Sequence, residues 1–216
     1  NSEVKTASNY QKKGYNKQML IVGLTGNYGM GKSYVLSMFK GLGALTLDSD
    51  KIVDSILKDK VVINKIIKIF GRDVLEKKGR LDKNKIAIKT FKNNKIRRKL
   101  EVLLHPLVFD RIQAFIKKIQ QKKCMLIVEV PLLFEGRYQG RFDKIITVYT
   151  TLKTAIERLN NSGVSHTDAV NRLKAQMPVK IKKKFSDFLI DNNGTKKDTR
   201  KQVAKIYKLL LQEIIE

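Results

Sequence analysis

A glycine-rich octapeptide, GNYGMGKS at 26–33, constrains this chain more than any other feature. It fits the pattern G-x-x-x-x-G-K-[ST] and lies between an apolar run, MLIVGLT at 19–25, and an amphipathic stretch at 33–40. The apolar run is typical of a parallel strand buried on both faces, and the stretch after it is typical of a helix. A strand, a glycine turn and a helix in this order predict a phosphate-binding loop, called the P-loop below, because backbone N–H groups at a helix N-terminus hold anions.

The side chains at the end of the P-loop indicate a nucleotide. Lys32 is expected to bridge the β- and γ-phosphates, and the Ser33 hydroxyl is expected to contact a magnesium ion that accompanies the nucleotide. The glycines of the motif permit backbone conformations and close approaches that a Cβ atom forbids. A glycine-rich turn without function is the alternative, and the strand and helix around the motif argue against it.

The remaining pattern predicts an α/β fold of three layers with about five parallel strands. Besides the first strand, short apolar runs indicate strands at 44–48, 124–130, 144–150 and 188–191. Residues 49–123 carry helical periodicity and no strand pattern, with a long helix expected at 107–119 after His105 and Pro106. Further helices are expected at 151–159, 165–175 and 199–215.

This pattern divides the chain into segments with different expected tasks. The first 18 residues show no periodicity and are expected to form a poorly ordered tail before a single domain at 19–216. The domain core is predicted at 19–50, 123–152 and 184–216, with a helical insertion at 51–122 that binds the acceptor and a helical lid at 153–183.

The composition narrows the class of protein. The net charge is +25, which suits nucleic acid, an anionic membrane or a polyanionic small substrate as a partner. Most of the basic residues are lysines spread along the chain, which favours solvated faces over one binding arm. No apolar run approaches the roughly 20 residues of a membrane span. The single cysteine excludes an internal disulfide framework, so a reducing, cytosolic setting is expected.

The second predicted strand ends in the segment Asp48-Ser49-Asp50, which carries two acids. Asp48 and Asp50 are expected at the carboxyl edge of the sheet, where ligands of parallel α/β folds bind. A carboxylate there can accept the proton of an attacking hydroxyl or hold metal-bound water. Ser49 or Asp50 may instead cap the helix that follows. An ATP-driven motor would need an acid that closes an apolar strand, for which Glu129 is the candidate. Phosphoryl transfer to a small acceptor fits the short chain better.

From Met19 onward the sequence resembles the dephospho-coenzyme A kinase family. Seven separated motifs carry the resemblance in the family's order, and together they are far more specific than the P-loop alone. They are GLTGNYGMGKS at 23–33, LDSD at 47–50, FGRDVLEKKGRLD at 70–82, RKLEVLLHP at 98–106, VPLLFE at 130–135, RLKAQ at 172–176 and SDFLIDNNG at 186–194.

The resemblance implies transfer of the γ-phosphoryl group of ATP to the 3′-hydroxyl of dephospho-coenzyme A, with Mg²⁺ at Ser33 and Asp48. It implies catalytic roles for Asp50, as the base, and for Lys32. The residues implied to bind ATP are Gly29, Met30, Gly31, Lys32, Ser33, Tyr34 and Asn193. The residues implied to bind the acceptor are Asp50, His105, Pro106, Leu132 and Glu135. By residue type alone, a helix entry is the alternative role of His105, and a cap or a salt bridge in a loop is the alternative role of Glu135.

One departure from the family pattern concerns an arginine of the lid. The segment RLNNSGVS at 158–165 is one residue shorter than the family's, so Asn161 or Ser162 stands where a phosphate-contacting arginine is expected. Arg158 is the predicted replacement, and Arg172 is the alternative.

Two rival functions remain open at this point. One is a P-loop kinase for another small hydroxyl acceptor, such as a nucleoside or nucleotide. The other is a basic P-loop protein that binds nucleic acid. For the kinase, a monomer without a specific nucleic-acid or membrane partner is expected.

Overall fold

The structure, a computed structural model, describes residues 19–76, 79–119 and 123–215. The tail predicted at 1–18 lies outside this range. The described chain divides into two compact units, one formed by residues up to Asp48 and from Lys123 onward, the other by Ser49–Ile119. Each unit is described by itself. Within the described ranges, no helix combines the length and the apolar character needed to cross a membrane.

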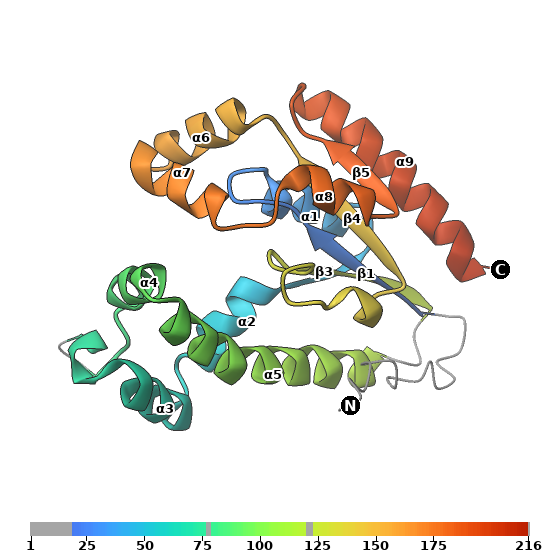
Figure 1. Cartoon of the computed structure of the whole chain (residues 1–216). Helices are drawn as coiled ribbons and strands as arrows, with labels where there is room; N and C mark the ends of the chain where they lie inside the picture. Colours follow the sequence, from blue (N-terminus) through green and yellow to red (C-terminus); the bar gives the residue numbers. More distant parts are fainter. Residues whose placement is uncertain (1–18, 77–78, 120–122, 216) are drawn as a thin grey trace, which may run out of the picture. The chain divides into compact units, whose positions relative to one another are not determined.

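The first unit is built on a parallel sheet of five strands in the order β2-β3-β1-β4-β5 (Figure 1). The strands are β1 (Met19–Thr25), β2 (Leu45–Asp48), β3 (Cys124–Glu129), β4 (Lys144–Tyr149) and β5 (Phe188–Asp191). β1 lies at the centre and pairs with β3 on one edge and β4 on the other, and six of its seven residues are buried. The P-loop at its carboxyl end therefore opens in the middle of the sheet edge.

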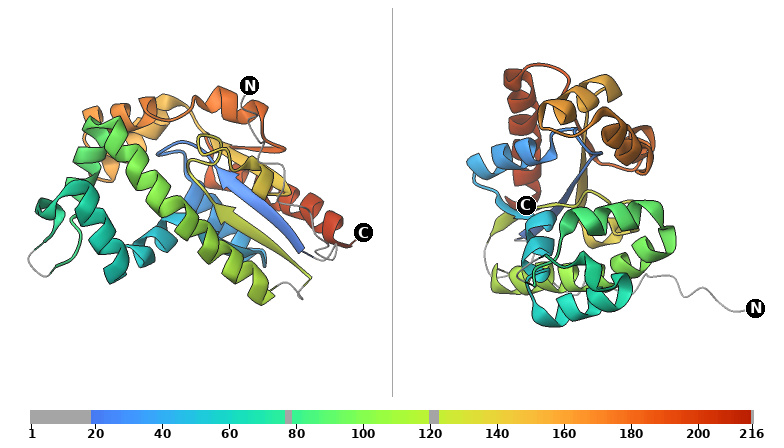
Figure 2. Two further views of the ribbon diagram at one scale, coloured as in Figure 1. Left: turned by 60° about the horizontal axis from the view of Figure 1, so that its bottom comes forward. Right: turned by 90° about the vertical axis from the view of Figure 1, so that its left-hand side faces the viewer.

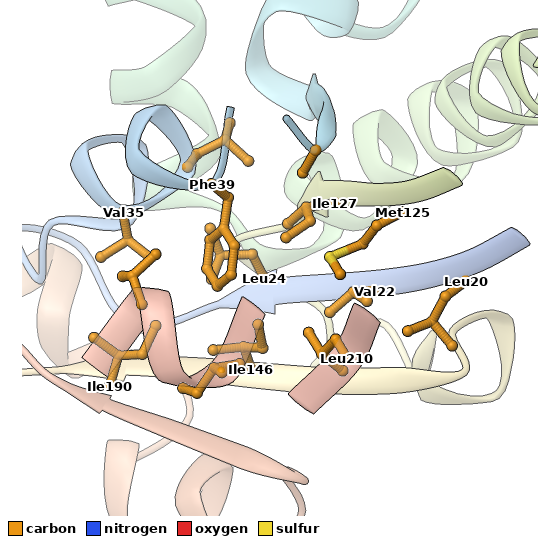
Figure 3. Close-up of a cluster of buried hydrophobic side chains, with 14 of the residues drawn as sticks. Leu20, Val22, Leu24, Val35, Phe39, Met125, Ile127, Ile146, Ile190 and Leu210 are labelled. Atoms are coloured by element: carbon orange, nitrogen blue, oxygen red, sulfur yellow. The ribbon is translucent and has the colours of Figure 1, made fainter. Parts of the chain in front are cut away.

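Helices α1 (Lys32–Gly41) and α9 (Lys196–Ile215) pack on one face of this sheet. Sixteen buried apolar residues form the core beneath them, which we call the sheet core. In Figure 3, Val35 and Phe39 of α1 point toward Leu24 and Ile146 of the strands. Because α1 starts at the P-loop, burial of its apolar face fixes the direction in which the helix leaves the loop.

Residues 152–184, which overlap the lid predicted at 153–183 and are called the lid segment below, contain α6 (Leu152–Asn161), α7 (His166–Lys174) and α8 (Val179–Lys184). The right-hand view of Figure 2 shows the strands between this segment and the α1–α9 pair. Five buried residues form a separate lid cluster: Met30, Ala155, Leu159, Ala169 and Leu173. Met30 belongs to the P-loop, so the loop contributes a side chain to the interior of the lid segment.

The second unit is helical, with α2 (Ser49–Ile56), α3 (Lys60–Phe70), α4 (Lys83–Lys92) and α5 (Asn94–Ile119). Side chains at the N-caps explain two of the helix starts. Asp59 accepts the Val61 N–H, and Asp82 accepts the N–H groups of Asn84 and Lys85. Among the described residues of this unit the only β-type pairing is one isolated bridge, Leu75 to Leu81.

The expected fold class is confirmed, but the expected start of the long helix is wrong. α5 runs through Pro106 without a break, so His105 and Pro106 lie in its interior rather than at its beginning. Proline removes one helical hydrogen bond at a cost of about 3 kcal/mol. The buried stripe Leu104, Val108, Ile112 and Ile116 continues across the proline at four-residue spacing, and burial of this stripe offsets that cost. The pattern also gave no sign of α8, a short helix made mostly of lysines.

Candidate nucleotide site

The P-loop turns between Thr25 and Lys32 in a backbone conformation that requires glycine. Gly29 and Gly31 have φ angles of +75° and +88°. A Cβ atom on Gly31 would lie 2.2 Å from the Asn192 Nδ2 atom, a side chain that is itself 5% exposed. The glycine thus lets the turn after β5 approach the backbone of the P-loop.

The Lys32 side chain folds back into the loop and is almost completely buried. Its Nζ atom donates a hydrogen bond to the Asn27 carbonyl oxygen, 3.2 Å away. The loop amides include the Met30 N–H, which donates to the same carbonyl at 3.3 Å. Tyr34, in the first turn of α1, is half-buried. These contacts place an ammonium group inside the loop that the sequence predicts to hold phosphate.

At the rear of the loop, residues 31–33, the Ser33 hydroxyl contacts an acid at the end of a neighbouring strand. The Ser33 hydroxyl donates to Glu129 Oε1 at 3.3 Å, and Glu129 stands opposite Asp48 in the pairing of β2 and β3. Glu129 is only 3% exposed. A hydroxyl and two carboxylates at one sheet edge are oxygen donors of the kind that Mg²⁺ prefers. Sequence reasoning weighed Glu129 only as the metal ligand of a motor, although an acid that closes an apolar strand was the available signal.

Arg158 of α6 lies beside the P-loop. Its Nη2 donates to the Asn192 carbonyl oxygen at 2.9 Å, and its Nη1 lies 3.7 Å from the position of a Cβ on Gly31. This Nη1 atom is buried and has no hydrogen-bond partner among the described residues. A buried guanidinium nitrogen without an acceptor costs about 1–3 kcal/mol, and an anion in the loop would remove that cost.

Arg172 of α7 approaches the other end of the loop, at Tyr28. Its guanidinium carbon lies 5.1 Å from the centre of the Tyr28 ring, and its Nη1 donates to the Tyr28 hydroxyl at 3.3 Å. Nη2 forms an ion pair with Asp168 at 2.8 Å. The hydrogen bond to Asp168 raises the pKa of Arg172, which stays charged. The Arg172 guanidinium is therefore engaged by both Asp168 and Tyr28.

The two asparagines after β5 have different tasks. Asn193 Oδ1 accepts the Thr150 hydroxyl and the Thr151 N–H, both at 2.7 Å, and so braces the start of α6. Its neighbour Asn192 is buried and donates from Nδ2 to the Met30 carbonyl oxygen at 3.0 Å. The sequence analysis named Asn193 as an ATP contact and gave Asn192 no separate task. Both lie in one polar turn, and only the structure tells which asparagine points toward the P-loop.

The turn after β3 carries Leu132, which is half-buried, and Glu135. Glu135 Oε1 accepts the Met177 N–H at 3.0 Å and pairs with the Lys182 amine at 2.9 Å. Lys182 is completely buried and also donates to the Pro131 carbonyl oxygen at 3.1 Å. Burial lowers the pKa of Lys182, while Glu135 acts in the opposite direction. Glu135 therefore forms the salt bridge that was its alternative role. Its partner, Lys182, is one of the lysines that the sequence analysis expected on solvated faces.

The other acceptor-binding candidates belong to the helical unit. Asp50 lies in the first turn of α2, two residues after the end of β2, and its side chain is exposed. His105 and Pro106 are adjacent residues in the interior of α5. Burial lowers the pKa of His105, and the carboxylate of Glu101 partly offsets this.

Comparison with known proteins gives this geometry a family context. A family model described as dephospho-CoA kinase matches residues 20–198. The dephospho-CoA kinase of Aquifex aeolicus is 38% identical over 193 residues, which cover 89% of this chain and 98% of that protein.

Solved structures agree with the sequence comparison. The structure of the protein TT1252 from Thermus thermophilus superposes with a TM-score of 0.79 at 27% identity, over 89% of this chain and 97% of that one. A dephospho-CoA kinase from Campylobacter jejuni gives a TM-score of 0.66 at 26% identity, over 90% of this chain and 98% of that one. The similarity therefore extends over both compact units.

Proposed function

The chain belongs to the dephospho-CoA kinase family, and on that premise we propose how its residues transfer the γ-phosphoryl group of ATP to the 3′-hydroxyl of dephospho-CoA. The observation that carries the proposal is the convergence of Lys32, Ser33 and Arg158 on one glycine loop. All three are groups that bind phosphate or its metal ion: Lys32 and Ser33 stand at the start of α1, and Arg158 comes from α6.

Catalysis in this proposal is mainly positioning and neutralisation of charge. The phosphates are held by Lys32 and by the backbone amides of Gly29–Ser33. Met30 contributes only its backbone, because its side chain is buried. The 3′-oxygen of the acceptor bonds to the γ-phosphorus as the bond from that phosphorus to the β–γ bridging oxygen breaks. ADP leaves with the bridging oxygen, and the proton of the hydroxyl passes to Asp50.

The donor set at the rear of the loop fits Mg²⁺. Ser33 and Asp48 are the proposed ligands, and Glu129 is added to them because its carboxylate already accepts the Ser33 hydroxyl. In the described part of the chain, no group of three or more acidic, histidine or cysteine side chains forms a metal site by itself. Phosphate oxygens and water would complete the set of ligands around the ion. When bound, the ion neutralises charge on the β- and γ-phosphates.

Arg158 is proposed to contact the transferred phosphoryl group in place of the arginine that the shortened segment lacks. Its free Nη1 atom lies next to the loop, whereas Arg172 is already engaged by Tyr28 and Asp168. Arginine at a developing phosphoryl charge accelerates transfer by on the order of 10³-fold or more. Tyr34 and Asn193 stay proposed contacts of ATP.

The acceptor is proposed to contact His105, Pro106, Leu132 and Glu135. Of these, Glu135 has one carboxylate oxygen, Oε1, already engaged by Lys182 and the Met177 N–H, while Oε2 is buried without a hydrogen-bond partner among the described residues. A hydroxyl or amide of the acceptor would satisfy that oxygen. A monomer and a cytosolic location complete the proposal.

A coupled assay of ADP release tests the function. The purified chain is given ATP and Mg²⁺ with dephospho-CoA, and in parallel with a panel of nucleosides, nucleotides and shikimate. We expect release that depends on dephospho-CoA and exceeds that with every other acceptor by at least about 10²-fold in kcat/KM, as expected when polar acceptor contacts are left unmade. Faster release with a nucleoside would assign the chain another acceptor.

A further inference from the structure

The connection between α7 and α8, residues 175–178, forms two hydrogen bonds with the front of the P-loop, by which we mean Asn27–Met30. Gln176 Oε1 accepts the Tyr28 N–H at 2.7 Å. The carbonyl oxygen of the next residue, Met177, accepts a hydrogen bond from the side-chain amide of Asn27 at 3.1 Å. Neither contact is implied by the motif in which Gln176 lies, so the function proposed above leaves this glutamine without a task.

This connection is itself held in place from the far side. Glu135 Oε1 accepts the Met177 N–H, and the same oxygen pairs with the buried Lys182. Lys182 donates to the Pro131 carbonyl oxygen, which also accepts the Thr25 hydroxyl at 3.2 Å. Hydrogen bonds thus run from the end of β1 through the turn after β3 to residue 177 and back to the P-loop. A buried network of this kind holds its members in one arrangement.

The bond from Tyr28 to Gln176 fixes the orientation of one peptide group. The Tyr28 N–H and the Asn27 carbonyl belong to the same planar unit, and in a trans peptide they point in opposite directions. Gln176 accepts the N–H, and the carbonyl on the opposite side accepts the Lys32 amine at 3.2 Å. If this peptide turned over, its N–H would face the ammonium group of Lys32, which is repulsive, and the Tyr28 N–H would lose the acceptor that Gln176 Oε1 provides.

We propose that Gln176 is a positioning residue for nucleotide binding: it locks the Asn27–Tyr28 peptide so that the carbonyl, and not the N–H, faces Lys32. The inference rests on the proposed function only in that Lys32 meets the phosphates. Through this peptide the lid segment controls where the Lys32 amine lies before ATP arrives. Without the hydrogen bond to Gln176, the peptide also adopts the other orientation. The apparent Kd for nucleotide then rises in inverse proportion to the fraction of molecules whose loop can bind it.

The test compares three variants by calorimetric titration with MgADP, followed by kinetics. Gln176→Leu keeps the size of the side chain and removes the acceptor, while Gln176→Glu keeps an acceptor in the same place. Gln202→Leu is the matched control, because Gln202 Oε1 also accepts a backbone N–H, from Asp191, at 2.9 Å. The titrations are run at about 0.3 M KCl so that the charge of the Glu variant is screened.

We expect Gln176→Leu to weaken MgADP binding about tenfold and to raise KM for ATP by a similar factor, with KM for dephospho-CoA unchanged. Gln176→Glu restores binding to within about threefold of the unmodified protein, and Gln202→Leu leaves MgADP binding unchanged. Unaltered MgADP binding in Gln176→Leu would overturn the proposal, as would an equal loss in Gln176→Leu and Gln176→Glu. Because MgADP titration needs no acceptor, failure to phosphorylate dephospho-CoA would count against the proposed function alone.

Discussion

The front and the rear of the P-loop are held by different parts of the chain. At the rear, Gly31–Ser33, the Ser33 hydroxyl donates to Glu129 at the end of β3, and Asn192 after β5 lies beside Gly31 while it donates to the Met30 carbonyl oxygen, so these two partners are fixed by the sheet. The front, Asn27–Met30, meets Gln176 and Arg172 and places a side chain in the lid cluster. One short loop thus joins two separately packed regions.

The sheet core and the lid cluster differ in size, and this predicts how each end of the P-loop responds to mutation. The sheet core has sixteen buried apolar members among the described residues and the lid cluster has five, so the rear of the loop rests on the larger hydrophobic stabilisation. Regions with few buried contacts open at lower free energy. We therefore expect changes in the lid segment to alter ATP binding before they alter global stability, whereas changes in the sheet core alter stability first.

The largest effect is expected from removal of the Lys32 amine, which belongs to the rear of the P-loop and bonds to the Asn27 carbonyl oxygen at the front. Lys32→Ala should lower kcat by at least about 10³-fold, since the preorganised charge on the phosphates is removed. The circular dichroism spectrum should match the unmodified protein, because Lys32 packs in the loop and is not part of either apolar cluster. Substantial turnover by this variant would contradict the P-loop assignment.

Asp48, the last residue of β2, and Asp50, in the first turn of α2, are expected to differ in their roles. Asp50→Asn should lower kcat by about 10²-fold or more with little change in KM for ATP, as expected for a positioned general base. Asp48→Asn, which alters the residue opposite Glu129, should instead raise the Mg²⁺ concentration needed for half-maximal rate. A larger fall in kcat for Asp48→Asn than for Asp50→Asn would transfer the base to Asp48.

Two glycines with the same φ angle distinguish the effect of backbone strain from the effect of the close approach of Asn192 to the P-loop. Gly31 and Gly163 both have φ of +88°, but only at Gly31 does an added Cβ meet Asn192, 2.2 Å away, whereas nothing lies within 4 Å at Gly163. Gly31→Ala should lower kcat/KM for ATP by about 10²-fold, and Gly163→Ala should cost about 1–3 kcal/mol of stability with normal kinetics. Equal kinetics for the two variants would show that the Asn192 contact has no role.

The two arginines sharpen the comparison, because one lies at each end of the loop. Arg158→Lys keeps the charge and loses the fork, and it should lower kcat at least tenfold with a change in Tm of less than about 2 °C. Arg172→Lys should mainly loosen Tyr28 and leave kcat nearly unchanged. A normal rate for Arg158→Lys with a collapse for Arg172→Lys would move the phosphate contact to Arg172.

The smallest expected kinetic effect comes from two leucines, one in each apolar region. Leu210→Ala in the sheet core and Leu159→Ala in the lid cluster should each cost about 2–5 kcal/mol in urea unfolding. Leu159→Ala should also raise KM for ATP a few-fold, because a Cβ placed on Gly29 would lie only 2.9 Å from Leu159, so this side chain directly adjoins the front of the loop. A raised KM in Leu210→Ala alone would reverse the comparison.

The sequence was sufficient for the parts of the molecule that follow from local pattern. The P-loop and its strand and helix could be predicted because one motif, one apolar run and one amphipathic stretch coincide at Gly26–Ser33. The strand at Phe188–Asp191 was predicted at its observed bounds for the same reason. These features depend on neighbours in sequence, which the pattern contains.

The parts that were missed depend on residues distant in sequence. Lys182 looked like one of many solvated lysines, and only its pairing with Glu135 explains its complete burial. Gln176 carries no signal for a contact with an amide 148 positions earlier in the chain. Pro106 indicated a helix boundary by local rule, and the buried stripe of α5 overrode that rule.

The central claim, phosphorylation of dephospho-CoA at this P-loop, is tested most directly by following the γ-phosphoryl group itself. The unmodified chain and Lys32→Ala, purified in parallel, are incubated with Mg²⁺, dephospho-CoA and ATP labelled in the γ-phosphate. The products are then separated and identified by mass. The account predicts that the label enters a product identical to coenzyme A with the unmodified chain and stays in ATP with Lys32→Ala. Label recovered only as inorganic phosphate, or transferred equally by both proteins, would contradict it.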